Sequence, residues 1–260
     1  MKARNLKFGA IDGFTLLEML VVMAVIGTLV GLTFPIYSHI VTSGRIAASV
    51  SNLTQLATAN LAYAADNDGY FCPAQERRNL VRWHGARTSG TGAFDPTKGF
   101  LAKYLGTEGR VKICPLLTPA MLATSSFEDG TGGYGYNEVY IGGTPQDPYK
   151  AAVVSQLSRP SQTVMFTTAA YARADGVQEY PFCEPPFWDF GGGPSGSRPS
   201  PTVHFRANGK ALVAWCDGHV SAEAPVPRTD GSNPHGGDAD KQQLGWFGPD
   251  DNNGYWNSKQ

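Results

Sequence analysis

The chain has 260 residues, with 21 Lys and Arg against 22 Asp and Glu, and its formal net charge is −1. This near-neutral balance excludes a protein whose whole surface binds nucleic acid by neutralising phosphates. Gly and Pro are frequent, at 31 and 18 residues, but 42% of the chain is hydrophobic, which excludes a wholly disordered chain. The length is sufficient for one or two domains.

Residues 14–34 form an apolar run of 21 residues that contains a single charge, Glu18. A helix of this length covers about 30 Å, which is the thickness of the hydrocarbon core of a bilayer. Lys2, Arg4 and Lys7 precede the run, so we expect the N-terminus in the cytoplasm and the rest of the chain outside. The run is longer than the apolar part of an ordinary secretory signal, and no small-residue cleavage site follows it. A membrane anchor is therefore favoured over a cleaved signal peptide.

Residues 13–18 read GFTLLE and stand directly before and within the apolar run. This segment resembles the N-terminal signal of the type IV pilin and type II secretion pseudopilin family. The resemblance implies that a prepilin peptidase removes residues 1–13 as a leader, cutting between Gly13 and Phe14. It also implies that Phe14 becomes the N-methylated first residue and Glu18 the fifth residue of the mature protein.

A carboxylate within an apolar helix is costly, by about 2.5–3.5 kcal/mol at mid-helix, and needs a partner. We expect Glu18 to pair with the α-ammonium group of Phe14 in a neighbouring subunit, which would set the register of helices packed in a filament. The alternative is that Glu18 reaches the lipid headgroups from the helix end.

Pro35 follows the apolar run and predicts a kink or local melting of the helix. Residues 35–68 continue as an amphipathic helix, with Asp66 and the residues up to Gly69 as its predicted stop. The predicted buried face repeats every three or four residues and consists of Ile46, Val50, Leu53, Ala57, Leu61 and Ala64.

Residues 69–260 contain short apolar runs separated by Gly and Pro, which predict an extracytoplasmic domain, here called the outer domain, with long loops. One or two helical turns are expected in Leu101–Leu105. Asp217-Gly218 stands between two apolar runs and is typical of a tight hairpin turn. The predicted fold class is α+β, a long N-terminal helix packed on a small antiparallel sheet. The candidate strands are Thr163–Thr168, Thr202–Phe205, Ala211–Cys216 and His219–Ala222.

A looser resemblance to one group of pseudopilin-like proteins continues through the outer domain. It rests on a Cys-Pro at Cys114, on GYGYN at 133–137, on SRPS at 158–161, and on His204 followed by WCDGHV at 215–220. Twelve residues separate His204 from Asp217, whereas nine are usual in that group. The hairpin is thus lengthened here, or the match at His204 is accidental.

Four cysteines, Cys72, Cys114, Cys183 and Cys216, lie in the part of the chain that we expect outside the membrane. None, one or two disulfides are compatible with this number, and we favour Cys72–Cys114 with Cys183–Cys216. A thiol enzyme using Cys216 with His204 and His219 is the competing hypothesis. No oxyanion-hole motif accompanies these residues, so we do not expect an enzyme.

Residues 229–260 form an acidic, Gly-rich tail. Major pseudopilins of the type II secretion system carry a calcium site in a C-terminal acidic loop, and the resemblance implies Asp238, Asp240 and Asp250 as ligands here. A solvated acidic turn is the alternative. The tail also contains four aromatic residues that we expect to pack on the sheet or to make a subunit or ligand contact: Trp246, Phe247, Tyr255 and Trp256.

The resemblance implies a structural subunit of a type II secretion pseudopilus or a type IV pilus, held in the inner membrane before assembly. The implied partners are copies of this chain, other pilin-like subunits, prepilin peptidase, membrane lipid and an inner-membrane platform driven by a cytoplasmic ATPase.

The alternative function is a surface-displayed binding protein that recognises polysaccharide, a cell surface or DNA. Its sugar-stacking candidates are Trp188, Trp246 and Trp256, although burial in the core is the favoured interpretation of each. DNA binding would rest on Arg77, Arg78, Arg82 and Arg87, but solvated loop charges are the favoured interpretation of this cluster. The leader carries three basic residues and one acidic residue, so the remainder has 18 basic against 21 acidic side chains and nucleic acid is not expected.

Overall fold

The computed structural model describes residues 13–124, 128–143, 150–188, 198–227, 236–248 and 253–257, without the side chains of residues 34–36. The chain divides into two compact units, Met1–Gly44 and Arg45–Gln260. The first unit contains the N-terminal part of the long helix, and the second contains the rest of that helix and the outer domain.

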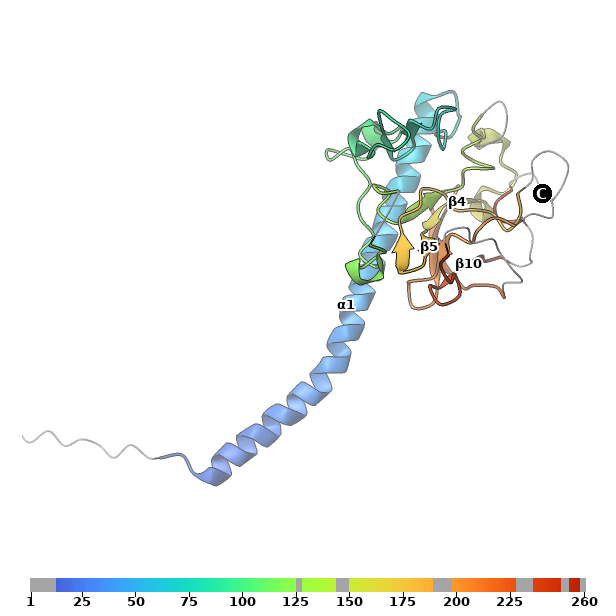
Figure 1. Ribbon diagram of the computed structural model, residues 1–260. Helices are drawn as coiled ribbons and strands as arrows, with labels where there is room; N and C mark the ends of the chain where they lie inside the picture. The colour runs from blue at the N-terminus through green and yellow to red at the C-terminus, as the bar shows by residue number, and fades with distance from the viewer. Residues whose placement is uncertain are drawn as a thin grey trace, which may run out of the picture. The chain divides into compact units, whose positions relative to one another are not determined.

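Helix α1 spans Leu16–Asp66 and is the main element of the first unit (Figure 1). The predicted stop is confirmed, because the Gly69 N–H returns to the Ala64 carbonyl oxygen at 2.9 Å and Gly69 adopts a φ of +79°. A kink or local melting was expected at Pro35, and local melting is wrong, since α1 is helical through this residue. A proline removes one backbone hydrogen bond, and the turns on either side can continue the helix across that gap.

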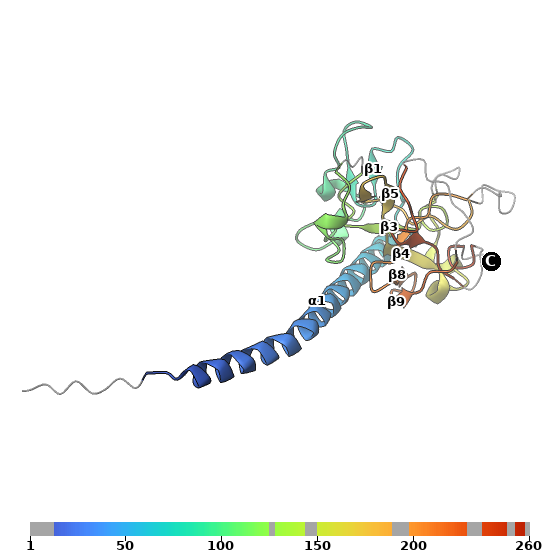
Figure 2. The ribbon, with the colours of Figure 1, turned by 60° about the horizontal axis from the view of Figure 1, so that its bottom comes forward.

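The main sheet of the outer domain has four antiparallel strands in the order β3-β4-β8-β9 (Figure 2). In this sheet β8 pairs with β4 on one side and with β9 on the other. The turn between β8 and β9 contains Gly218 at a φ of +95°, which confirms the predicted Asp217-Gly218 hairpin. The bounds are Tyr134–Tyr136 for β3, Val164–Thr168 for β4, Ala211–Trp215 for β8 and Val220–Glu223 for β9.

Among the described residues, the outer domain also contains three two-stranded antiparallel sheets. The predicted strand Thr202–Phe205 is present as β7 but pairs with β10 rather than with the main sheet. The paired strands are Val81–Arg82 (β1) with Gly85–Ala86 (β2), Tyr171–Arg173 (β5) with Gly176–Gln178 (β6), and Val203–His204 (β7) with Leu244–Gly245 (β10). Short 3-10 helices occupy Pro96–Lys98, Ala102–Tyr104, Pro119–Met121, Val154–Gln156 and Pro160–Gln162.

The two faces of the main sheet belong to different hydrophobic cores, as β8 shows. Leu212 and Ala214 point into a core shared with α1, while Val213 and Trp215 point into a second core. This alternation is the period of two expected of a strand that is buried on both faces. The sheet is therefore a central layer, covered on one side by the C-terminal part of α1 and on the other by the C-terminal part of the outer domain.

Helix α1 covers one face of the sheet with its residues 45–66. The predicted buried face is confirmed: Leu53, Ala57 and Ala64 are buried, and Ile46, Val50 and Leu61 pack against the same core. Two polar residues on this side are also buried and are hydrogen bonded to loops. Asn60 Oδ1 accepts the Cys72 N–H at 2.8 Å, and Ser49 Oγ lies 3.3 Å from Cys114 Sγ.

The C-terminal aromatic residues cover the opposite face of the sheet. Trp246, Phe247 and Trp256 are buried in the second core, and Tyr255 packs on it. The expectation that the tail packs back on the sheet is confirmed for these residues. Asn137 fixes the C-terminal segment to the sheet, because its Nδ2 donates to the Val164 oxygen at 2.9 Å and to the Trp256 oxygen at 3.0 Å.

Candidate functional site

Thr15 and Glu18 form reciprocal hydrogen bonds at the start of α1. Glu18 Oε2 accepts the Thr15 backbone N–H and the Thr15 hydroxyl, both at 2.8 Å, and Thr15 Oγ1 accepts the Glu18 N–H at 3.2 Å. This is a capping box, in which a threonine before the helix and a glutamate three residues later satisfy otherwise unpaired backbone donors. The helix thus starts two residues after Phe14, the first residue expected after cleavage.

The capping box was missed in the sequence analysis, although its signal is local and visible. Residues 15–18 read TLLE, which is the threonine-x-x-glutamate pattern immediately before an apolar run. The structure therefore gives Glu18 a role within its own chain, in addition to the predicted pairing with Phe14 of a neighbour.

The surface of α1 that follows the capping box is apolar and exposed. Leu16 is 85% exposed, Met23 67% and Leu32 68%. The hydroxyl groups of two threonines on this surface are bonded to the helix itself: Thr28 Oγ1 donates to the Val25 oxygen at 2.8 Å, and Thr33 Oγ1 to the Leu29 oxygen at 2.9 Å. These bonds make the threonines compatible with an apolar environment.

Helix α1 is long and apolar enough to cross a membrane, by length and composition, and it is the one such helix among the described residues. A continuous exposed apolar surface of this kind requires lipid or other apolar helices as its surroundings. The first unit therefore fits an inner-membrane anchor.

The four cysteines are free thiols, and all four are buried. The predicted disulfides Cys72–Cys114 and Cys183–Cys216 are not present in the structure. Each thiol lies among tightly packed core residues, Cys72 and Cys114 in the core shared with α1 and Cys183 in the second core. Burial raises the pKa values of the Cys72, Cys183 and Cys216 thiols well above their usual range, so these thiols are protonated.

The residues of the thiol-enzyme hypothesis do not form a site. Cys216 lies in the core shared with α1, whereas His204 is buried on β7. His219 is exposed, stacks on Trp215 and bonds through Nδ1 to Asp217 Oδ1 at 2.6 Å. A buried protonated thiol without a contacting base is a poor nucleophile.

The arginines considered for DNA binding are partly internal. Arg82 is buried, forms a salt bridge of 2.6 Å with Glu128, and lies 4.9 Å from the centre of the Phe94 ring. Arg87 lies 4.6 Å from the same ring centre. The interpretation of this cluster as solvated loop charges was wrong for Arg82, because the carboxylate and the ring allow its burial. The cluster therefore does not present four free cations to a phosphate backbone.

The tryptophans considered for sugar stacking are largely enclosed. Trp246 and Trp256 are buried in the second core, as favoured from the sequence. Trp188 is half-buried and donates from Nε1 to Glu184 Oε2 at 2.9 Å.

Two of the three predicted calcium ligands are described, Asp238 and Asp240, and Asp250 lies outside the described residues. The Asp238 carboxylate accepts the Lys241 N–H and forms an ion pair of 3.1 Å with Lys241 Nζ. No group of three or more His, Cys, Asp or Glu side chains in the described ranges is arranged to hold a metal ion. The described part of the tail does not form a calcium site by itself, and calcium binding therefore stays a proposal.

A long exposed apolar helix on an α+β domain, started by a capping box next to Phe14, defines a pilin-like architecture. Residues 11–34 match the prokaryotic N-terminal methylation motif, the hallmark of type IV pilin and pseudopilin signals. The chain thus carries a prepilin-type signal, and the motif indicates a structural subunit rather than an enzyme. No curated protein and no solved structure matches the chain.

Proposed function

We propose that this pilin-like protein is a filament subunit, stored in the inner membrane and assembled into a type II secretion pseudopilus or a type IV pilus-like filament. The observation that carries the proposal is the exposed apolar surface of α1, which begins at the capping box beside the cleavage site. Such a surface suits lipid before assembly and neighbouring apolar helices after it.

Glu18 is the residue through which the helices are positioned relative to one another. Cleavage between Gly13 and Phe14 releases an α-ammonium group next to the capping box. One carboxylate oxygen of Glu18, Oε2, is held by Thr15, and the carboxylate keeps its negative charge for the ammonium group of Phe14 in a neighbouring subunit. In an apolar surrounding, an unpaired carboxylate costs several kcal/mol, on the order of 3, so one axial register is favoured.

The topology follows from the leader. Its basic residues Lys2, Arg4 and Lys7 keep the N-terminus in the cytoplasm, where the peptidase and the assembly platform meet it. The outer domain then lies on the periplasmic side. Energy for assembly comes from a cytoplasmic ATPase through the platform, because the sequence has no phosphate-binding loop with a lysine and a following helix.

Cysteine crosslinking tests the assembly directly. Two cysteines replace the exposed Leu20 and Leu29 of α1 in the same variant, and a bifunctional maleimide is applied to membranes and to sheared filaments. The native thiols are buried and do not react while the protein is folded. We expect ladders of crosslinked copies in the filament fraction and mostly single chains in membranes. The proposal is rejected if cells with a complete assembly system yield only uncrosslinked chains.

A further inference from the structure

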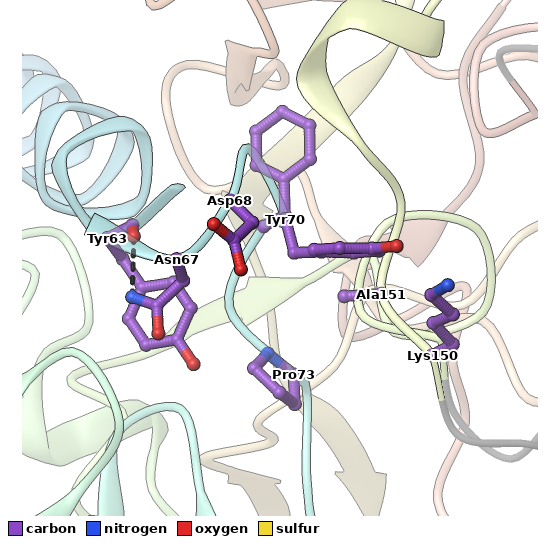
Figure 3. A pocket seen from close by; sticks show the side chains of 8 residues that line it. Tyr63, Asn67, Asp68, Tyr70, Pro73, Lys150 and Ala151 are labelled. Carbon is purple, nitrogen blue, oxygen red and sulfur yellow. Dashed lines mark hydrogen bonds between the residues drawn. The ribbon is translucent and has the colours of Figure 1, made fainter. Parts of the chain in front are cut away.

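A pocket of about 350 Å³ lies at the C-terminal end of α1, in the outer-domain unit (Figure 3). Its walls come from the last turn of the helix, from the segment that follows it, and from the chain around residue 150. The lining includes Tyr63, Asn67, Asp68, Tyr70, Pro73 and Lys150. The pocket is open to solvent, because Asp68 and Lys150 are exposed and the other four are half-buried.

Hydrogen bonds to backbone carbonyl groups hold the walls of the pocket in place. The Asn67 side chain donates from Nδ2 to the Tyr63 carbonyl at 2.7 Å, which fixes its orientation at the helix end (Figure 3). On the opposite wall the Phe71 N–H donates to the Ala152 oxygen and the Val154 N–H to the Gly69 oxygen, both at 2.9 Å. The two walls are therefore formed before any ligand binds, which lowers the entropic cost of binding.

The lining combines three aromatic side chains, two of them tyrosines, with a balanced set of polar groups. Asp68 supplies a carboxylate and Lys150 an ammonium group, whose Nζ lies 4.7 Å from the centre of the Tyr70 ring. Because the Asn67 amide nitrogen is used by Tyr63, its Oδ1 is the acceptor that this side chain offers. The nearby Asp66 is already bonded to Lys103 Nζ at 3.2 Å and to the Tyr104 hydroxyl at 3.0 Å. The charges that line the pocket thus cancel.

We propose that this pocket binds a neutral saccharide unit. The tyrosine rings and Pro73 suit the apolar face of a sugar ring, and Asp68, Asn67 and Lys150 provide acceptors and a donor for its hydroxyl groups. This inference goes beyond the filament role and does not depend on it.

Other ligand classes fit the same lining less well. A cationic ligand would meet the ammonium group of Lys150, which already lies over the Tyr70 ring. An anion would meet the Asp68 carboxylate. A wholly apolar ligand would remove water from a carboxylate, an ammonium group and an amide without replacing their hydrogen bonds. A neutral polyhydroxylated ligand can form hydrogen bonds with the carboxylate, the ammonium group and the amide.

The test uses the full-length protein in a polyoxyethylene detergent, since a detergent with a sugar headgroup would itself compete for the pocket. The probes are cellobiose, maltose and N,N′-diacetylchitobiose, with choline and digalacturonic acid as the charged comparisons, and binding is measured by saturation-transfer NMR. We expect at least one neutral disaccharide to bind, with a Kd on the order of 1 mM. Neither charged probe is expected to bind.

Two variants and matched controls locate the binding. Tyr70→Leu keeps the bulk of the side chain and is expected to weaken binding about ten-fold. Asp68→Asn keeps the left-handed backbone at φ +51°, which asparagine tolerates, and is expected to weaken binding about three-fold. The controls Tyr37→Leu and Asp129→Asn change exposed residues outside the pocket and should leave the Kd unchanged.

Three outcomes would overturn the proposal. The first is that none of the three disaccharides binds at 10-fold excess over the expected Kd, about 10 mM. The second is that choline or digalacturonic acid binds and the disaccharides do not. The third is that a disaccharide binds equally well to the protein, to Tyr70→Leu and to Asp68→Asn. Filament assembly is measured separately by the crosslinking ladders, so a failure here is distinguishable from a failure of the filament proposal.

Discussion

Thr15 and Glu18 form reciprocal hydrogen bonds across the first turn of α1. The Glu18 carboxylate accepts both the N–H and the hydroxyl of Thr15 at 2.8 Å. The same carboxylate is the one proposed to pair with Phe14 of a neighbouring subunit. Glu18 therefore has two separable roles. Its hydrogen bonds cap its own helix, and its negative charge is proposed to pair with Phe14 of a neighbouring subunit.

Two substitutions at Glu18 separate these properties. Glutamine also serves in a capping box, so Glu18→Gln keeps the cap and removes the charge, while Glu18→Ala removes both. We expect both variants to insert into the membrane normally, and both to reduce the amount of sheared filament at least ten-fold, which corresponds to about 1.4 kcal/mol of lost pairing. Immunoblots of sheared and membrane fractions provide the measurement.

Thr15→Val is the matched control, since it weakens the cap and leaves the charge. It should reduce filament yield much less than Glu18→Gln does. Filaments at the normal level from Glu18→Gln would show that the cap alone matters, and would refute the charge-pairing part of the account.

Glu138 and Glu184 form a buried acid pair in the outer domain, and burial raises the pKa values of both carboxyl groups. Glu184 also accepts the Tyr180 hydroxyl at 3.0 Å and the Trp188 indole N–H at 2.9 Å, so the negative charge is stabilised on Glu184 and the proton is retained by Glu138. Burial, and then the neighbouring Glu184, raise the pKa of Glu138 well above its ordinary value of 4.5. The charge of Arg82 opposes this shift in the pKa of Glu138. The Tyr180 hydroxyl faces Glu184, whereas the Tyr171 hydroxyl lies 2.8 Å from Ser200 Oγ.

This pair predicts a loss of stability as pH rises. Above the ordinary carboxyl pKa the unfolded chain releases the Glu138 proton, whereas the folded chain keeps it until the raised pKa is reached. The stabilisation is thus fully present below about pH 4.5 and declines above it. In Glu138→Gln this side chain does not titrate, so the melting temperature of the wild type should fall by about 2–4 °C or more relative to this variant between about pH 5 and pH 8.

Thermal melts of the two proteins at matched pH values test this prediction. Hydrogen bonds lower the pKa values of Asp66 and Asp95, that of Asp95 to about 2. These two groups make the folded protein less stable as the pH falls in the acid range. Both groups are present in the wild type and in Glu138→Gln. The difference between the two melting curves therefore isolates the pair. Parallel pH profiles would show that Glu138 does not retain its proton.

The buried thiols predict a specific labelling pattern. We expect no reaction of Cys72, Cys114, Cys183 or Cys216 with iodoacetamide in the folded protein, and four modified cysteines after denaturation without reductant. Intact-mass spectrometry counts the added groups. Two or fewer groups on the denatured, unreduced chain would establish a disulfide and contradict the structure.

The calcium proposal for Asp238, Asp240 and Asp250 predicts stabilisation by the metal. A cation that binds only the folded chain at 100 times its Kd adds about 2.7 kcal/mol, which should raise the melting temperature by several degrees in millimolar calcium. Asp240→Asn should lose most of this rise, and Asp129→Asn should retain it. An unchanged melting temperature with calcium would remove the site.

The parts of the fold that follow from local pattern could be predicted from the sequence. The end of α1 beyond Asp66, its buried face through Leu53 and Ala57, and the hairpin at Gly218 all depend on residues close together in the chain. Strands β3 and β5 were missed. The Tyr-Gly-Tyr of β3 is only three residues long and contains a glycine, which strands disfavour, and it is a strand because it pairs with β4.

The errors at candidate sites also have a physical cause in long-range packing. No spacing in the sequence shows that Arg82 meets Glu128, or that the thiols lie buried without pairing. The pocket beside Tyr70 was missed for the same reason, because Lys150 reaches it from a distant part of the chain. In contrast, the processing signal is contiguous at residues 11–34, and the sequence alone was sufficient to recognise it.

The intact mass of the protein extracted from membranes, after expression with a prepilin peptidase, tests the central claim most directly. The account predicts a chain that begins at Phe14, has lost residues 1–13 and carries one added methyl group, with the whole of α1 retained. A soluble product that lacks the apolar part of α1, or a membrane protein that still carries its leader and no methyl group, would contradict it.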